Sequence, residues 1–65
     1  MFKYCWMIEK RNYLLCVGKS GKELIDVSFI SEIALKFDTP QEAKRFLDKN
    51  MLDGYFVSEH GFWED

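Results

Sequence analysis

The sequence predicts a small α+β domain in which one helix packs on one face of a mainly antiparallel sheet. Three features lead to this prediction. Apolar and polar residues alternate with a period of two near the N-terminus, glycine-containing turns separate the apolar runs, and one strong helix-capping signal follows them. We expect the element order ββββαβ and, at 65 residues, a single domain that spans residues 1–65.

The first two expected strands form a hairpin. In residues 2–9, aromatic and branched side chains alternate with other types, a pattern typical of a strand. Residues 9–12 are a polar break, and the apolar run 13–17 predicts a more central strand. Two strands joined by a short polar link indicate a β-hairpin.

Residues 18–21 predict the second turn, because their two glycines supply positive φ at no steric cost. This Gly-Lys-Ser-Gly stretch also resembles the end of a phosphate-binding loop. Such a loop requires glycine where Tyr13 stands, and it must lead into a helix. Since the residues that follow are strand-like, we interpret the stretch as a hairpin turn.

A third strand is expected over residues 22–27. After it, Phe29 and Ile30 are expected to tuck a loop or short turn onto the core, although the conformation of residues 27–32 is left open. In residues 33–37, branched and aromatic side chains alternate with Ala and Lys, which predicts a short fourth strand that leads into the helix.

The start of the helix is the sharpest local signal. Thr39 is expected at the N-cap, Pro40 at the first helical position and Glu42 at the third, which together form a capping box with the preferred proline. Ala43, Phe46 and Leu47 then form one apolar stripe, Lys44 and Asp48 pair on the opposite side, and Asn50 ends the helix. The stripe is expected to face the sheet.

The chain turns at Asp53-Gly54, and residues 55–59 predict the last strand. Residues 61–65 are then expected to form a tail. Its two large aromatic residues, Phe62 and Trp63, either fold back to cap the small core or form a binding surface, since aromatic side chains are favoured anchors of interfaces.

Charge is unevenly distributed along the chain. The net charge is −2, but residues 1–22 carry +4, whereas residues 51–65 carry −4 and contain no Lys or Arg. Two explanations remain open. The two ends neutralise each other in the fold, or they form a dipolar surface that steers a partner.

Composition argues against several classes of protein. Aromatic residues make up 17%, too many for a disordered chain, and no segment reaches the ~20 apolar residues of a membrane span. The first residues do not resemble a signal peptide, so we expect a cytoplasmic protein with Cys5 and Cys16 reduced. With one histidine, a four-ligand zinc site is not available within one chain, and we expect neither metal nor cofactor.

Catalysis and nucleic-acid binding are both disfavoured. His60 is the only histidine, and no carboxylate pair stands in an evident cleft. The first hairpin has basic and aromatic residues, but the sequence pI of about 5.3 and the acidic end oppose binding to phosphates. The candidate interface residues are therefore aromatic, basic and histidine side chains: Trp63, Phe62, Tyr55, His60, Trp6, Lys10, Arg11, Lys19 and Lys22.

Two segments resemble small accessory proteins of bacteriophages and prophages of Gram-positive hosts. In residues 34–47 the shared features are a short strand ending in Lys-Phe, a Thr-Pro-x-Glu cap and an Ala-x-x-Phe-Leu stripe; the hairpin of residues 6–15 is similar as well. The resemblance covers about half of the chain and carries over no site residues. It implies a small non-enzymatic protein that binds and blocks a protein of the bacterial host, such as an immune effector or a nuclease.

A second function stays open. Two or more copies of the chain could enclose a nucleotide-like signal between basic and aromatic side chains and so act as a sponge. Self-association would also compensate for the small core that a chain of this size can bury.

Overall fold

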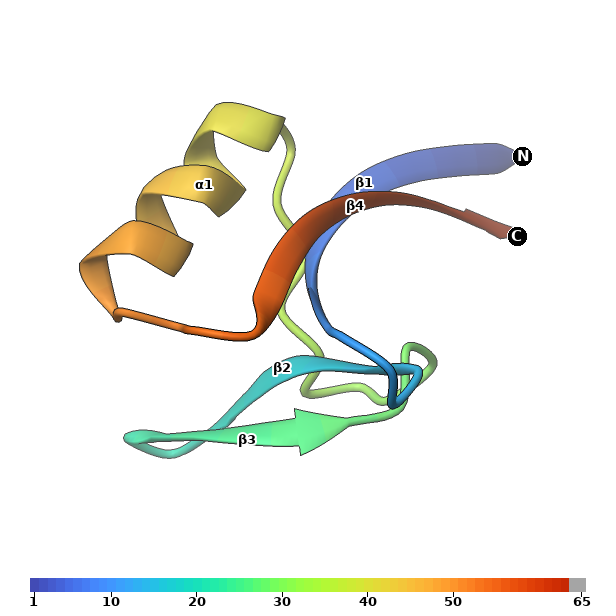
Figure 1. The fold of residues 1–65 in the computed structure, drawn as a ribbon. Coiled ribbons are helices and arrows are strands. Elements are labelled where there is room, and N and C mark those ends of the chain that lie inside the picture. Colours follow the sequence, from blue (N-terminus) through green and yellow to red (C-terminus); the bar gives the residue numbers. More distant parts are fainter. Residues whose placement is uncertain (64–65) are drawn as a thin grey trace.

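Four strands form one antiparallel sheet in the computed structural model, which describes residues 1–63. The sheet has the order β3-β2-β1-β4, and its strands and single helix are β1 (Phe2–Lys10), β2 (Leu15–Ser20), β3 (Glu23–Val27), α1 (Pro40–Lys49) and β4 (Tyr55–Trp63). The helix packs against β1 and β4 (Figure 1). The predicted α+β class, with one helix on one face of an antiparallel sheet, is confirmed.

The predicted fourth strand over residues 33–37 is not a strand, so the order is βββαβ. The segment instead fills a gap between two diverging strands, because β1 and β2 pair only next to their connecting turn. Leu35 N–H donates to the Val17 carbonyl of β2 at 3.0 Å. Further along the segment, Trp6 of β1 and Phe37 exchange two hydrogen bonds of 2.8 Å. Isolated bridges to two strands therefore replace a continuous ladder.

Both turns are displaced toward the C-terminus relative to their predicted positions, residues 9–12 and 18–21. Tyr13 and Leu14 belong to the first turn rather than to β2; both are exposed, and Leu14 has a φ of 53°. Gly18 lies inside β2, and the second turn is formed by Gly21, whose φ is 60°, and Lys22. A strand follows this turn, as the hairpin interpretation requires and as a phosphate-binding loop does not allow.

The helix begins and ends where the sequence predicts. Thr39 Oγ1 accepts a hydrogen bond from the Glu42 N–H at 3.2 Å, Pro40 is the first helical residue and Asn50 is the C-cap. Lys44 Nζ and Asp48 Oδ1 lie 3.0 Å apart on the exposed side. The expected sheet-facing stripe is confirmed as well, because Ala43 is buried and Phe46 and Leu47 are half-buried against the same core.

Buried side chains lie on both faces of the sheet. On the helix side, Ile8 and Val17 pack with Ala43 of the helix. On the opposite side, Met7 and Cys16 pack with the segment after β3, where Phe29 is half-buried against them, as expected. Ile30 was expected beside it, but its side chain is 86% exposed. The segment after β3 thus covers the face of the sheet that lies opposite the helix.

Strand β4 is longer than the predicted strand 55–59. It continues to Trp63, so Phe62 and Trp63 belong to the sheet and the expected tail is wrong for residues 61–63. The pairing runs from Lys10 opposite Tyr55 to Phe2 opposite Trp63. The beginning of β1 and the end of β4 therefore lie side by side, away from the helix (Figure 1). Residues 64 and 65 of the expected tail lie outside the described residues.

Candidate functional site

Three aromatic side chains gather at the end of the β1–β4 ribbon that the helix does not reach. Phe2, Tyr4 and Trp63 are 50%, 66% and 72% exposed, and the alternation of the paired strands sets them on one face. The Phe2 ring centroid lies 5.2 Å from that of Tyr4 and 6.2 Å from that of Trp63, both with edge-to-face geometry. We call Phe2, Tyr4 and Trp63 the aromatic face.

A cavity of about 320 Å³ lies beside the same end of the ribbon. Lys36 Nζ stands 4.3 Å from the ring centroid of Phe62, a cation–π distance. The Cys5 thiol borders the cavity, and burial raises its pKa even though Lys36 opposes that shift. The lining residues combine basic, acidic and aromatic groups: Lys3, Tyr4, Cys5, Lys36, Asp38, Phe62 and Trp63.

His60 has the neighbours of a catalytic triad but not its geometry. Ser58 Oγ and Glu9 Oε1 lie 2.9 and 3.3 Å from the same ring nitrogen, Nε2. In a triad the acid holds one nitrogen and the nucleophile hydrogen-bonds the other. The imidazole also stacks on Phe29, with ring centroids 4.3 Å apart. These contacts hold His60 against the segment after β3, and Ser58, His60 and Glu9 are not arranged as a triad.

Tyr55 and Lys10 are held by one carboxylate. Lys10 Nζ donates to Asp26 Oδ2 at 2.7 Å, and the Tyr55 hydroxyl donates to Asp26 Oδ1 at 2.5 Å. The hydrogen bonds from Lys10 and then from Tyr55 lower the pKa of Asp26, and the same bonds raise the pKa values of Lys10 and Tyr55. The three side chains link β1, β3 and β4 to one another, so a structural role accounts for their arrangement.

The remaining predicted site residues are dispersed. Arg11 lies over the ring of Phe56, 5.6 Å from its centroid, while the exposed Lys19 and Lys22 lie at the opposite end of β2. Trp6 is half-buried in the helix-side core. The first hairpin therefore does not form one continuous basic and aromatic surface.

Of the nine predicted site residues, only Phe62 and Trp63 come together at the end of the ribbon, one on each face. Sequence reasoning missed Phe2 and Tyr4. The signal was present in the period-two alternation of residues 2–8, which sets Phe2, Tyr4 and Trp6 on one face of a strand. The pairing of this strand with Trp63 could not be read from that pattern.

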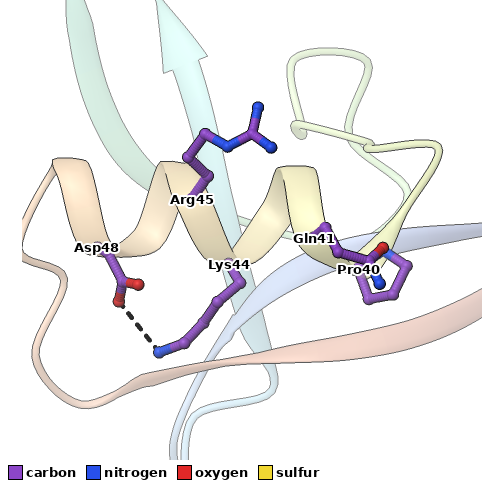
Figure 2. A pocket seen from close by; sticks show the side chains of 5 residues that line it. All are labelled: Pro40, Gln41, Lys44, Arg45 and Asp48. Atoms are coloured by element: carbon purple, nitrogen blue, oxygen red, sulfur yellow. Dashed lines mark hydrogen bonds and ion pairs between the residues drawn. The ribbon is translucent and has the colours of Figure 1, made fainter.

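A second depression lies along the outer side of α1, as Figure 2 shows. All of its lining residues belong to this one helix: Pro40, Gln41, Lys44, Arg45 and Asp48. Lys44 and Asp48 are paired with each other, and no second element closes the depression. It is the solvated face of an amphipathic helix rather than an enclosed site.

Comparisons with protein-family models, curated proteins and solved structures gave no match. Within residues 1–63, no group of His, Cys, Asp and Glu side chains is arranged to hold a metal ion. The same residues include no helix with the length and apolar character that a membrane crossing requires.

Proposed function

We propose that this chain is a non-catalytic binding protein that docks on another protein through its aromatic face. The exposure of Phe2, Tyr4 and Trp63 on one small face carries the proposal. Contiguous exposed apolar surface marks interaction sites in small proteins, and Trp and Tyr are enriched among the residues that dominate binding energy. The edge-to-face rings restrain one another, which reduces the entropy lost on binding.

The resemblance to phage accessory proteins supports a host protein as the partner. In that setting the chain acts in the cytoplasm of a bacterial cell and blocks one host polypeptide, such as an immune effector or a nuclease. Blocking by occupancy needs a stable platform and exposed anchors but no catalytic group. The unsuitable geometry around His60 is consistent with this function.

Site-specific photo-crosslinking tests the proposal. A photoreactive phenylalanine analogue replaces Trp63 in one variant and the exposed Gln41 of the helix in a control variant. We expect one host polypeptide to be captured from position 63 and not from position 41, with excess unlabelled protein competing. With that purified polypeptide, Trp63→Ala should raise Kd at least about tenfold. Equal capture from both positions would contradict docking through the aromatic face.

The cavity beside Lys36 favours a second function, a sponge for a small nucleotide-like signal. Lys3 and Lys36 could meet an anionic group while Phe62 and Trp63 offer ring surfaces, and a second copy could complete the enclosure. Native mass spectrometry of protein purified from signal-producing cells separates the two functions. A small ligand bound to an oligomer would support the sponge, and a ligand-free protein that captures one polypeptide would support protein binding.

A further inference from the structure

The outer edge of β4 offers unpaired backbone groups at alternate residues. Antiparallel pairs alternate between hydrogen-bonded and non-hydrogen-bonded positions. Two observations show which β1–β4 pairs are hydrogen-bonded. Arg11 N–H donates to Gly54 O at 2.9 Å, so this pair is hydrogen-bonded. Both backbone groups of Trp6 bond Phe37 instead, away from β4. Trp6 lies opposite Glu59, so the N–H and C=O of Glu59 turn to the outer edge. By alternation the other outward residues are Tyr55, Val57, Gly61 and Trp63.

The second half of this edge is accessible. Glu59, Gly61 and Trp63 are exposed, whereas Tyr55 and Val57 lie half-buried in the helix-side core. Within residues 1–63, no backbone hydrogen bond joins Glu59, Gly61 or Trp63 to a segment outside the sheet. Such an edge is a template for a further strand. The side chains of Glu59 and Trp63 lie on the same face of the sheet as those of Phe2 and Tyr4. A strand added at this edge would therefore lie directly beside the aromatic face.

Charge defines the strand that would fit this edge. Glu59 stands in the middle of β4 and forms no ion pair among the described residues. Residues 51–65 carry four acidic side chains and no Lys or Arg. If two β4 strands paired antiparallel around Glu59, the two Glu59 carboxylates would stand directly opposite each other, and like charges directly opposite are destabilising. An edge of this charge favours a basic strand over a second copy.

We propose that β4 binds an extended segment of the partner protein as a fifth strand, with Lys or Arg opposite Glu59 and a large apolar side chain opposite Gly61. Gly61 has no side chain, and the Phe2 ring lies over it, with Tyr4 beside it. An apolar side chain there packs on those rings, while backbone hydrogen bonds supply affinity. This inference rests on the proposed function, since it specifies how the partner is recognised.

Amide hydrogen exchange with a model peptide tests the proposed edge. The probe is the synthetic peptide Val-Thr-Phe-Thr-Lys-Thr-Phe-Thr-Val, whose palindromic order suits either strand direction; its matched control has Glu in place of Lys. We expect the Lys peptide to slow exchange at Glu59 and Gly61 at least about tenfold. Ser58 and His60 should be protected already in the free protein, because their amides bond β1.

Charge reversal provides the second measurement. Glu59→Lys should weaken binding of the Lys peptide about fivefold and strengthen binding of the Glu peptide by a similar factor. Glu59→Gln serves as the neutral control if reversal perturbs folding. Equal binding of both peptides to the native chain, or no added protection at millimolar peptide, would overturn the proposal.

The outcomes separate this inference from the proposed function. Protection at Glu59 and Gly61 that increases with protein concentration, without peptide, would assign the edge to a second copy of the chain. It would overturn the proposal that a strand of the partner protein binds there. Loss of partner binding in Trp63→Ala with no change in Glu59→Lys would leave docking through the aromatic face in place and remove β4 pairing. Capture from positions 63 and 41 alike would instead remove the proposed function itself.

Discussion

The ring of Phe2 lies over the backbone of Gly61, so closely that a Cβ at Gly61 would overlap Phe2 Cε1 and Cζ. The two residues come from opposite ends of the chain, and β1–β4 pairing brings them together. The absence of a side chain at Gly61 lets the Phe2 ring approach the strand closely, beside Trp63 and Tyr4. This contact therefore helps to set the geometry of the aromatic face.

Gly61→Ala should disturb the aromatic face while the domain stays folded. The atoms that meet the new methyl group are the far end of a half-exposed ring that can rotate, so we expect a stability loss of about 1 kcal/mol. The indole NMR resonance of Trp63 should shift, because Phe2 contacts it. An unchanged indole resonance would contradict the role of Gly61 in positioning the rings.

Gly18→Ala is the matched substitution in the core and should cost more. A Cβ at Gly18 would lie 2.7 Å from Val27 Cγ2 and 3.0 Å from the Ile33 carbonyl oxygen, a backbone atom that cannot rotate away. We expect a loss of about 2–3 kcal/mol, measured by urea unfolding, with no specific change at Trp63. A milder effect than that of Gly61→Ala would show that residues 33–35 are not fixed against β2.

Thr39→Ala should lower the free energy of unfolding by about 1 kcal/mol, because the Glu42 N–H loses its acceptor at the helix start. Thr39→Ser keeps the hydroxyl and is the control. Thermal unfolding of both variants checks the prediction. If the alanine variant is as stable as the serine variant, the cap does not contribute to stability.

Phe46→Ala should cost about 3 kcal/mol, near the lower end for removing an aromatic side chain from a core, since Phe46 is only half-buried. Its ring packs against Phe37, with centroids 5.4 Å apart, so its loss also releases the segment that joins β1. A single core in so small a domain rarely supplies more than about 3–5 kcal/mol, so circular dichroism should show a large loss of folded protein in the variant. The exposed Arg45→Ala on the same helix should remain folded.

Local chemistry explains which parts of this fold could be predicted from the sequence. The helix was predicted from Thr39 to Asn50 because capping depends on neighbouring residues and a fixed spacing. The turn at Gly18 was misplaced for a complementary reason. Glycine occurs not only in turns but also where two segments approach each other closely. Here Gly18 makes room for Val27 and the Ile33 backbone, which are distant in the sequence, so no local pattern specifies these contacts.

The candidate site was predicted only in part because it depends on strand pairing. Trp63 was predicted as a candidate interface residue, but in a tail, since Gly61 and the polar residues before it resemble the end of a strand. Pairing with β1 carries β4 through Gly61. Phe2 and Tyr4 were not recognised, because their exposure depends on where the helix stops covering the sheet.

Stability should depend on pH through Asp26. Hydrogen bonds from Lys10 and Tyr55 lower its pKa from about 3.8, so this stabilisation is present above pH 4 and is lost as pH falls through the lowered pKa. Asp26→Asn should therefore melt earlier than the native chain at pH 7, and the difference should shrink in acid. It should also shrink above about pH 10, because the pKa values of Tyr55 and Lys10 are raised and their stabilisation is lost once they deprotonate.

The two tryptophans provide the decisive comparison between folding and binding. Trp63 is 72% exposed at the end of β4, whereas Trp6 is half-buried in the helix-side core. Truncation of an interface anchor typically costs binding about 2 kcal/mol or more, while loss of a core aromatic costs about 3 kcal/mol or more of stability. Trp63→Ala should keep its Tm within a few degrees and weaken partner binding at least about tenfold; Trp6→Ala should melt far earlier. Calorimetry measures the Tm of each variant, and titration with the purified partner that crosslinking identified measures binding. A Trp63→Ala variant that melts early yet binds normally when folded would make Trp63 a structural residue and leave the exposed Lys19 and Lys22, near the second turn, as the better interface candidates.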